Sequence, residues 1–215
     1  ENIVAEFPEE AEGYWGLVLC KYGIEYVDDK KTAKKIPTCH RTVPSAVTKD
    51  ENFKKAIECA DVVAQKLYKE EAKAIDKLQK QILKIVENEE PYDVFICYKE
   101  TDSKGKRTDD STIAQDIYTE LVKANYKVFF ARVTLRDKAG SDYEPYIYSA
   151  LSSAKVMLAI GTKEEYYDAV WVKNEWSRFL ALIKNGAKKM LIPAYKDMDP
   201  YDLPEEFSHL QAQDM

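Results

Sequence analysis

Short apolar runs alternate with amphipathic stretches in the C-terminal part of the chain. Ile113, Ile117 and Leu121 recur every four residues and predict one helical face in a helix of about 14 residues. Near-continuous apolar strands that alternate with helices are typical of a parallel sheet covered on both faces. The pattern therefore predicts a flavodoxin-like, doubly wound α/β domain, in which ligands bind at the carboxyl ends of strands. The predicted strands are residues 94–97, 128–130, 156–160 and 190–193.

The first 90 residues show a different, mainly helical pattern. Residues 11–27 are rich in apolar and aromatic side chains and follow Pro8-Glu9-Glu10, which suits a helix N-terminus. This segment resembles a single tetratricopeptide-like helix, the remnant of a repeat that normally occurs in several copies. Residues 30–48 are expected to form a long connection. Thr48-Lys49-Asp50-Glu51 has the form of a capping box and predicts a helix of about 35 residues that ends near residue 88.

An apolar seam runs along this predicted long helix. Its members follow one another at intervals of three and four residues: Tyr68, Ala72, Ile75, Leu78, Ile82 and Ile85. Burial against the helix that contains Trp15 is the favoured interpretation, and a self-association surface is the alternative. The polar stretch at residues 87–91 marks a domain boundary. We therefore expect a helical region at 1–90 and the α/β domain at 91–215.

Composition narrows the range of functions. The net charge of −6 and the pI near 5.2 argue against a protein that binds nucleic acid through its phosphates. No run of about 18 apolar residues is present, so no membrane span is expected. The four cysteines lack metal-site spacing, and we expect reduced thiols in a cytoplasmic protein and no metal. The chain does not begin with Met, which indicates a fragment of a longer protein.

Several familiar catalytic motifs are missing from the α/β region. No Gly-x-Gly-x-x-Gly follows the first strand, and neither a P-loop nor Gly-x-Ser-x-Gly occurs. The two histidines are His40 and His209, so a histidine-based triad in this region depends on His209 alone. The third strand ends in Ile160-Gly161 and lacks the Asp of a phosphorylated receiver domain. These chemistries are therefore disfavoured.

A carboxylate remains among aromatic and cationic residues. Glu175 follows Trp171 by four residues, which places both on one helix face. Tyr98, Lys99 and Arg132 stand at strand ends, and Tyr143 follows the second strand. One carboxylate can stabilise an oxocarbenium-like transition state, and nicotinamide leaves without a general acid because its ring nitrogen becomes neutral. Aromatic rings can stack on flat bases, and Lys99 or Arg132 can bind a pyrophosphate.

Three segments carry a resemblance to a known family. Asp93-Val94-Phe95-Ile96-Cys97-Tyr98 resembles the first box of Toll/interleukin-1 receptor (TIR) domains, whose usual form is D-V-F-I-S-Y. Residues 135–140 lie where that family has its mobile BB loop. Trp171-x-x-x-Glu175 resembles the W-x-x-x-E motif of bacterial and plant-pathogen TIR proteins. The resemblance covers about residues 91–215, without the family's final helix, and says nothing about residues 1–90.

The resemblance implies two kinds of function. Some TIR domains assemble only as signalling scaffolds, whereas others hydrolyse or cyclise NAD+, which is their substrate and not a resident cofactor. In the enzymatic branch the helical Glu is catalytic, a role that falls on Glu175, and Trp171 shapes the nicotinamide-ribose pocket. Tyr98 and Lys99 match the substrate-contacting strand end, where relatives often have Tyr-Arg, and Tyr143 matches an aromatic position after the BB loop.

We therefore predict a bacterial NAD+ nucleosidase or ADP-ribosyl cyclase. The resemblance implies ADP-ribose or a cyclic ADP-ribose isomer as product, a role in antiphage signalling, and self-association that builds the site between subunits. The first alternative is a non-catalytic TIR scaffold. A second is a nucleoside deoxyribosyltransferase-like enzyme, which also has a flavodoxin-like sheet and a carboxylate at a glycosidic bond.

Overall fold

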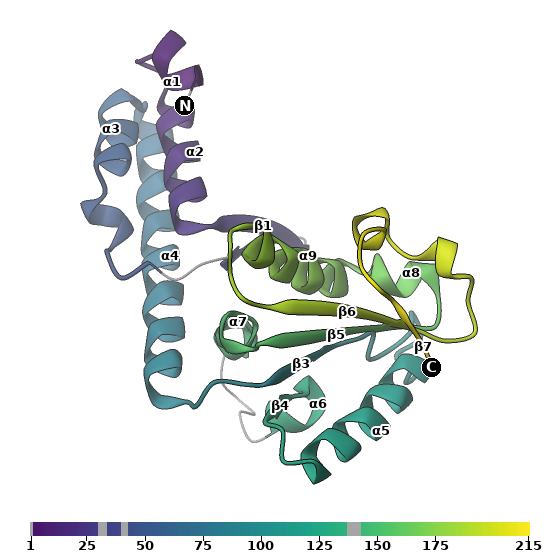
Figure 1. The fold of residues 1–215 in the computed structure, drawn as a ribbon. Coiled ribbons are helices and arrows are strands. Elements are labelled where there is room, and N and C mark those ends of the chain that lie inside the picture. The colour runs from purple at the N-terminus through teal and green to yellow at the C-terminus, as the bar shows by residue number, and fades with distance from the viewer. Residues whose placement is uncertain (1, 30–33, 40–42, 137–142) are drawn as a thin grey trace. The chain divides into compact units, whose positions relative to one another are not determined.

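The computed structural model describes residues 2–29, 34–39, 43–136 and 143–215. The chain divides into two compact units, Glu1–Asn88 and Glu89–Met215, which are described separately (Figure 1). None of the helices in the described ranges is long and apolar enough to cross a membrane.

A five-stranded parallel sheet forms the centre of the second unit, which we call the α/β unit. Its strand order is β4-β3-β5-β6-β7, so the chain leaves β3 for one neighbour and later returns to its other side (Figure 1). This order and the parallel pairing confirm the predicted flavodoxin-like sheet. The strands are β3 (Val94–Cys97), β4 (Val128–Phe129), β5 (Val156–Gly161), β6 (Met190–Tyr195) and β7 (Gln213–Asp214).

Five α-helices accompany the described part of this sheet. They are α5 (Asp109–Lys123), α6 (Ala131–Thr134), α7 (Glu144–Ser153), α8 (Glu164–Tyr167) and α9 (Val170–Lys184), with short 3-10 turns at Pro200–Asp202 and Glu205–Phe207. The predicted apolar face of α5 is confirmed, because Ile113, Ile117 and Leu121 pack against the buried core. Its N-cap is Thr108, whose hydroxyl accepts a hydrogen bond from the Ser111 N–H. The chain leaves α9 through Asn185 and Gly186, which has a φ of 88°, as predicted.

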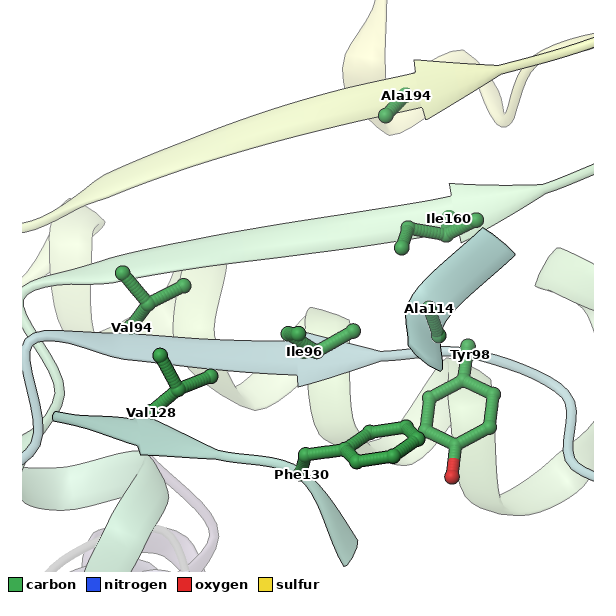
Figure 2. Packing of buried hydrophobic residues seen from close by; sticks show 8 residues of the cluster. All are labelled: Val94, Ile96, Tyr98, Ala114, Val128, Phe130, Ile160 and Ala194. Carbon is green, nitrogen blue, oxygen red and sulfur yellow. The ribbon is translucent and has the colours of Figure 1, made fainter. Parts of the chain in front are cut away.

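The core lies on both faces of the sheet because strand side chains alternate. Val94, Ile96 and Tyr98 point to the face covered by α5, where they pack with Ala114 and Phe130 (Figure 2). Cys97 points to the opposite face, which α9 contacts. Helices therefore bury both faces of the strand whose carboxyl end carries the predicted site residues.

The N-terminal unit is mainly helical, and its described residues include a hairpin that was not predicted from the sequence. Residues 30–48 were expected to be a connection, but β2 pairs antiparallel with β1, with Ile24 opposite Cys39. Proline is tolerated at position 37 because both strands of a two-stranded sheet are edge strands. The unit contains α1 (Asn2–Glu6), α2 (Ala11–Tyr22), β1 (Ile24–Asp29), β2 (Lys34–Cys39), a 3-10 turn (Val47–Lys49), α3 (Glu51–Cys59) and α4 (Val62–Asn88).

Three helix boundaries in this unit differ from the prediction. The helix expected over residues 11–27 ends at Tyr22, because Gly23 adopts a left-handed conformation with φ of 60°. The N-cap before α3 is Asp50, whose carboxylate accepts hydrogen bonds from two backbone N–H groups. The expected single long helix is interrupted at residues 60–61, where Asp61 accepts from the Ala64 N–H and begins α4.

The apolar seam of α4 is buried inside the N-terminal unit. Tyr68, which is 6% exposed, stacks on Trp15 with ring centroids 4.9 Å apart. Ala72, Ile75 and Ile82 are also buried. The stacking of Tyr68 on Trp15 confirms the predicted packing against the helix that contains Trp15, and the buried side chains are not exposed for self-association, whereas Ile85 is only partly buried.

Candidate active site

A cavity of about 440 Å³ opens at the carboxyl ends of β3 and β4 in the α/β unit. It brings together five of the six predicted site residues: Tyr98, Lys99, Arg132, Trp171 and Glu175. The other lining residues are Phe95, Ile96, Glu100, Thr101, Ala131 and Val172. The sixth predicted residue, Tyr143, does not line it. Tyr143 precedes α7 and is 53% exposed.

Three elements position the predicted side chains around this cavity. Tyr98 and Lys99 directly follow β3, and Arg132 lies on α6 just after β4. Trp171 and Glu175 lie one turn apart near the start of α9. Of the predicted mobile loop at residues 135–140, residues 137–140 lie outside the described residues.

Buried contacts hold α9 against the sheet. The Trp176 indole N–H donates to the Tyr167 carbonyl at 2.9 Å, and the Cys97 thiol donates to the Val172 carbonyl at 3.6 Å. Trp176 is 1% exposed and Cys97 is fully buried. The helix turn that carries Glu175 is therefore fixed relative to β3, the strand that Tyr98 directly follows.

The Glu175 carboxyl has an unusual protonation equilibrium. Its side chain reaches the cavity, but protein surrounds the carboxyl group, and this burial raises the pKa of Glu175 to about 7. The Cys97 thiol and the Arg178 charge favour the ionised form and partly oppose the effect. Burial keeps the pKa of the Cys97 thiol well above its usual value, so this neighbour stays neutral. Glu175 therefore changes charge near neutral pH.

The cavity contains a second carboxylate, Glu100, which was not predicted from the sequence. Its Oε2 accepts hydrogen bonds from the Tyr98 hydroxyl at 2.6 Å and the Ser111 hydroxyl at 3.2 Å. Its Oε1 forms an ion pair with Nη1 of Arg132. Burial alone favours the neutral acid, but the hydrogen bonds from Tyr98 and Arg132 outweigh it and lower the pKa of Glu100. The sequence contains one indication that Glu100 belongs to the site, because this residue follows the strand-end residue Tyr98 by two positions.

A buried carboxylate on α5 fixes the backbone around the cavity. Asp110 is fully buried and accepts hydrogen bonds from the Thr162 N–H at 2.8 Å and hydroxyl at 2.7 Å. Burial raises the pKa of Asp110 to about 6 despite these bonds. The Thr108 hydroxyl also donates to the Lys99 carbonyl. The N-terminus of α5 thus ties together the segments that follow β3 and β5.

The chemistry of this cavity depends on carboxylates, cations and aromatic rings. No group of three or more metal-ligating side chains is found within the described ranges. The two carboxylates differ in their expected state at neutral pH. Glu100 is ionised and paired, whereas Glu175 lies close to its midpoint. Such a pair of carboxylates in different environments is common at sites of acid–base and glycosidic chemistry.

Comparison with known proteins identifies the α/β unit. The sequence profile described as the TIR domain matches residues 94–215. A similar solved structure is the TIR domain of the Toll-related receptor TRR-2 from the lower metazoan Hydra magnipapillata. It is 19% identical, with 57% of this chain and 83% of that chain covered and a TM-score of 0.36. No curated protein matches the chain. Because the profile matches more than half of its residues, the chain belongs to the TIR domain family.

Proposed function

We propose that this TIR protein cleaves the nicotinamide–ribose bond of NAD+. The observation that carries the proposal is the position of Glu175. Glu175, whose carboxyl has a pKa raised to about 7, lines a cavity together with Trp171, Tyr98 and two cationic side chains. Ligand sites of flavodoxin-like sheets lie at the carboxyl ends of strands, as this cavity does. Its volume of about 440 Å³ is within the range of small-molecule sites.

The reaction we propose needs one ionised carboxylate. The ionised Glu175 accepts hydrogen bonds from the ribose hydroxyls and stabilises positive charge on the ribose as the C–N bond breaks. The bonding electron pair moves to the pyridinium nitrogen, so nicotinamide leaves as a neutral molecule. Water then adds to the ribose with loss of a proton and gives ADP-ribose. Attack by the adenine ring of the same molecule gives a cyclic isomer instead.

The remaining residues of the cavity suit the other parts of the dinucleotide. Trp171 is 37% exposed and presents a ring on which the nicotinamide can stack. Lys99 and Arg132 are cations suited to the pyrophosphate, although Lys99 cannot form the bidentate contact of an arginine. Tyr143, which precedes α7, is also proposed as a substrate contact.

We also propose a setting for this activity. TIR domains commonly self-associate, and active members of the enzymatic branch build their site between subunits. Self-association would therefore bring further groups to the cavity beside Trp171. The W-x-x-x-E form suggests a bacterial protein, and we propose that its product is an antiphage signal.

A signalling scaffold without catalysis is the second candidate. One observation favours it: Arg132 is already paired with Glu100, so a cation suited to phosphate is partly neutralised. In a scaffold, the same cavity would have no substrate and Glu175 would serve only the packing of α9.

Nicotinamide release from NAD+ separates the two candidates. Purified wild-type protein at high concentration is incubated with NAD+, and the products are separated by chromatography. Glu175→Gln tests the carboxylate, and Glu120→Gln serves as the matched control because Glu120 pairs with Lys123 on the exposed face of α5. The enzyme predicts release by wild type and control and loss in Glu175→Gln. Equal release by Glu175→Gln, or none by any protein even when assembled, would contradict it.

A further inference from the structure

The Glu100–Arg132 ion pair forms part of the lining of the cavity that the proposed substrate enters. Both residues line the cavity, and Nη1 of Arg132 meets Oε1 of Glu100. Their side chains are 40% and 38% exposed, so the pair is accessible to a ligand. A phosphate group that binds Arg132 must compete with this carboxylate for the same guanidinium.

The two oxygens of Glu100 have separate partners. Oε2 accepts hydrogen bonds from the Tyr98 and Ser111 hydroxyls, whereas Oε1 forms the ion pair with the Arg132 guanidinium. Ser111 is itself fully buried and accepts a hydrogen bond from Nε of Arg107 at 3.1 Å. Glu100 is therefore held in place by Tyr98, which directly follows β3, and by Ser111 on α5, so it stays where it is when Arg132 turns toward a ligand.

We propose that Glu100 is a specificity-determining residue that limits the affinity of the cavity for phosphate-bearing nucleotides. This inference rests on the proposed function and extends it. In the free protein Arg132 is held by Glu100, and only the fraction of molecules with Arg132 released is competent to bind a pyrophosphate. A ligand without phosphate does not use Arg132 and is unaffected. A phosphate-bearing ligand therefore needs strong contacts elsewhere in the cavity to displace Glu100 from Arg132.

The expected magnitude follows from the exposure of the pair. An ion pair of this exposure favours the paired form of Arg132 over the released form by a factor of up to about five. The apparent dissociation constant of a phosphate-bearing ligand rises by the same factor. Glu100→Gln keeps an oxygen that can accept from Tyr98 and Ser111 but removes the charge. We therefore expect this variant to bind ADP-ribose more tightly than wild type, by up to about fivefold, with unchanged affinity for nicotinamide.

Isothermal titration calorimetry with ADP-ribose tests this inference without requiring turnover. The proteins are wild type, Glu100→Gln, Glu100→Met as a second charge removal, and Glu120→Gln as the control for loss of an exposed, paired carboxylate. Tighter binding by both Glu100 variants, absent from the control, supports the inference. Unchanged or weaker binding by correctly folded Glu100 variants overturns it.

The same measurement in an Arg132→Gln background tests whether Glu100 acts through the guanidinium. The gain from Glu100→Gln should then disappear, and a gain of the same size would overturn the role of the pair. The binding experiment also distinguishes failure of this inference from failure of the proposed reaction. Tighter ADP-ribose binding without nicotinamide release would support the pair and refute the enzyme, whereas nicotinamide release with unchanged binding would do the reverse.

Discussion

Replacing Glu175 with Gln is expected to stabilise the α/β unit while removing its proposed catalytic group. Gln has nearly the same shape but cannot ionise. The fold raises the pKa of Glu175 from 4.5 to about 7, so ionised Glu175 opposes folding at neutral and alkaline pH. A rise of this size corresponds to about 3 kcal/mol once the group is fully ionised. Part of the side chain reaches solvent at the cavity, so this value is an upper bound.

The pKa shift also determines how the stability difference between wild type and Glu175→Gln changes with pH. Between pH 4.5 and about 7 the folded protein keeps a proton on Glu175 that the unfolded chain has lost. The stability of wild type therefore falls as pH rises through this window, and that of Glu175→Gln lacks this loss. The variant should gain up to about 3 kcal/mol at pH 8 and less than about 1 kcal/mol at pH 5.

Urea unfolding at both pH values, followed by tryptophan fluorescence, measures the difference. Trp176 is buried beside Glu175 on α9 and reports on the unit concerned. Glu120→Gln is the control, because its exposed carboxylate should change stability by no more than about 0.5 kcal/mol at either pH. A Glu175→Gln variant that is no more stable than wild type at pH 8, or equally stabilised at both pH values, would refute the reasoning.

Two further predictions follow from the same structure. Because the proposed reaction uses ionised Glu175, kcat/KM for NAD+ should rise with pH and level off above about 7, and a rate independent of pH across this range would argue against the assignment. Gly161→Ala should destabilise the α/β unit by about 1–3 kcal/mol, because its Cβ would lie 2.2 Å from the buried ring of Tyr167. That ring cannot easily move away, since its hydroxyl donates a hydrogen bond to the Ala194 carbonyl at 2.8 Å. A thermal unfolding temperature equal to that of wild type would show that the ring does move and would contradict this prediction.

The α/β architecture was predictable because its signals are local. Each buried strand is an apolar run, and the core face of α5 repeats every four residues within a single helix. The spacing of Trp171 and Glu175 likewise fixes their shared helix face. The shared location of Tyr98, Lys99 and Arg132 was also predictable, because parallel strands place their carboxyl ends at one edge of the sheet.

The parts that were missed depend on contacts between distant residues. Glu100 meets Arg132 across 32 positions, and Asp110 meets Thr162 across 52, so neither pair leaves a periodic signal. The hairpin of β1 and β2 was not predicted because Pro37 usually indicates the end of a strand, although proline is compatible with an edge strand. The interruption before α4 lacks Gly or Pro, and only the capping carboxylate of Asp61 marks it.

Nicotinamide release from NAD+ by wild type and Glu175→Gln, measured above pH 7 on the samples used for unfolding, tests the central claim most directly. The account predicts that the wild type releases nicotinamide and that the variant, although more stable, releases none. Loss of activity in a stabilised protein excludes unfolding as its cause. Release at the wild-type rate by Glu175→Gln, or no release by the assembled wild type, would contradict the assignment of this TIR protein as an NAD+-cleaving enzyme.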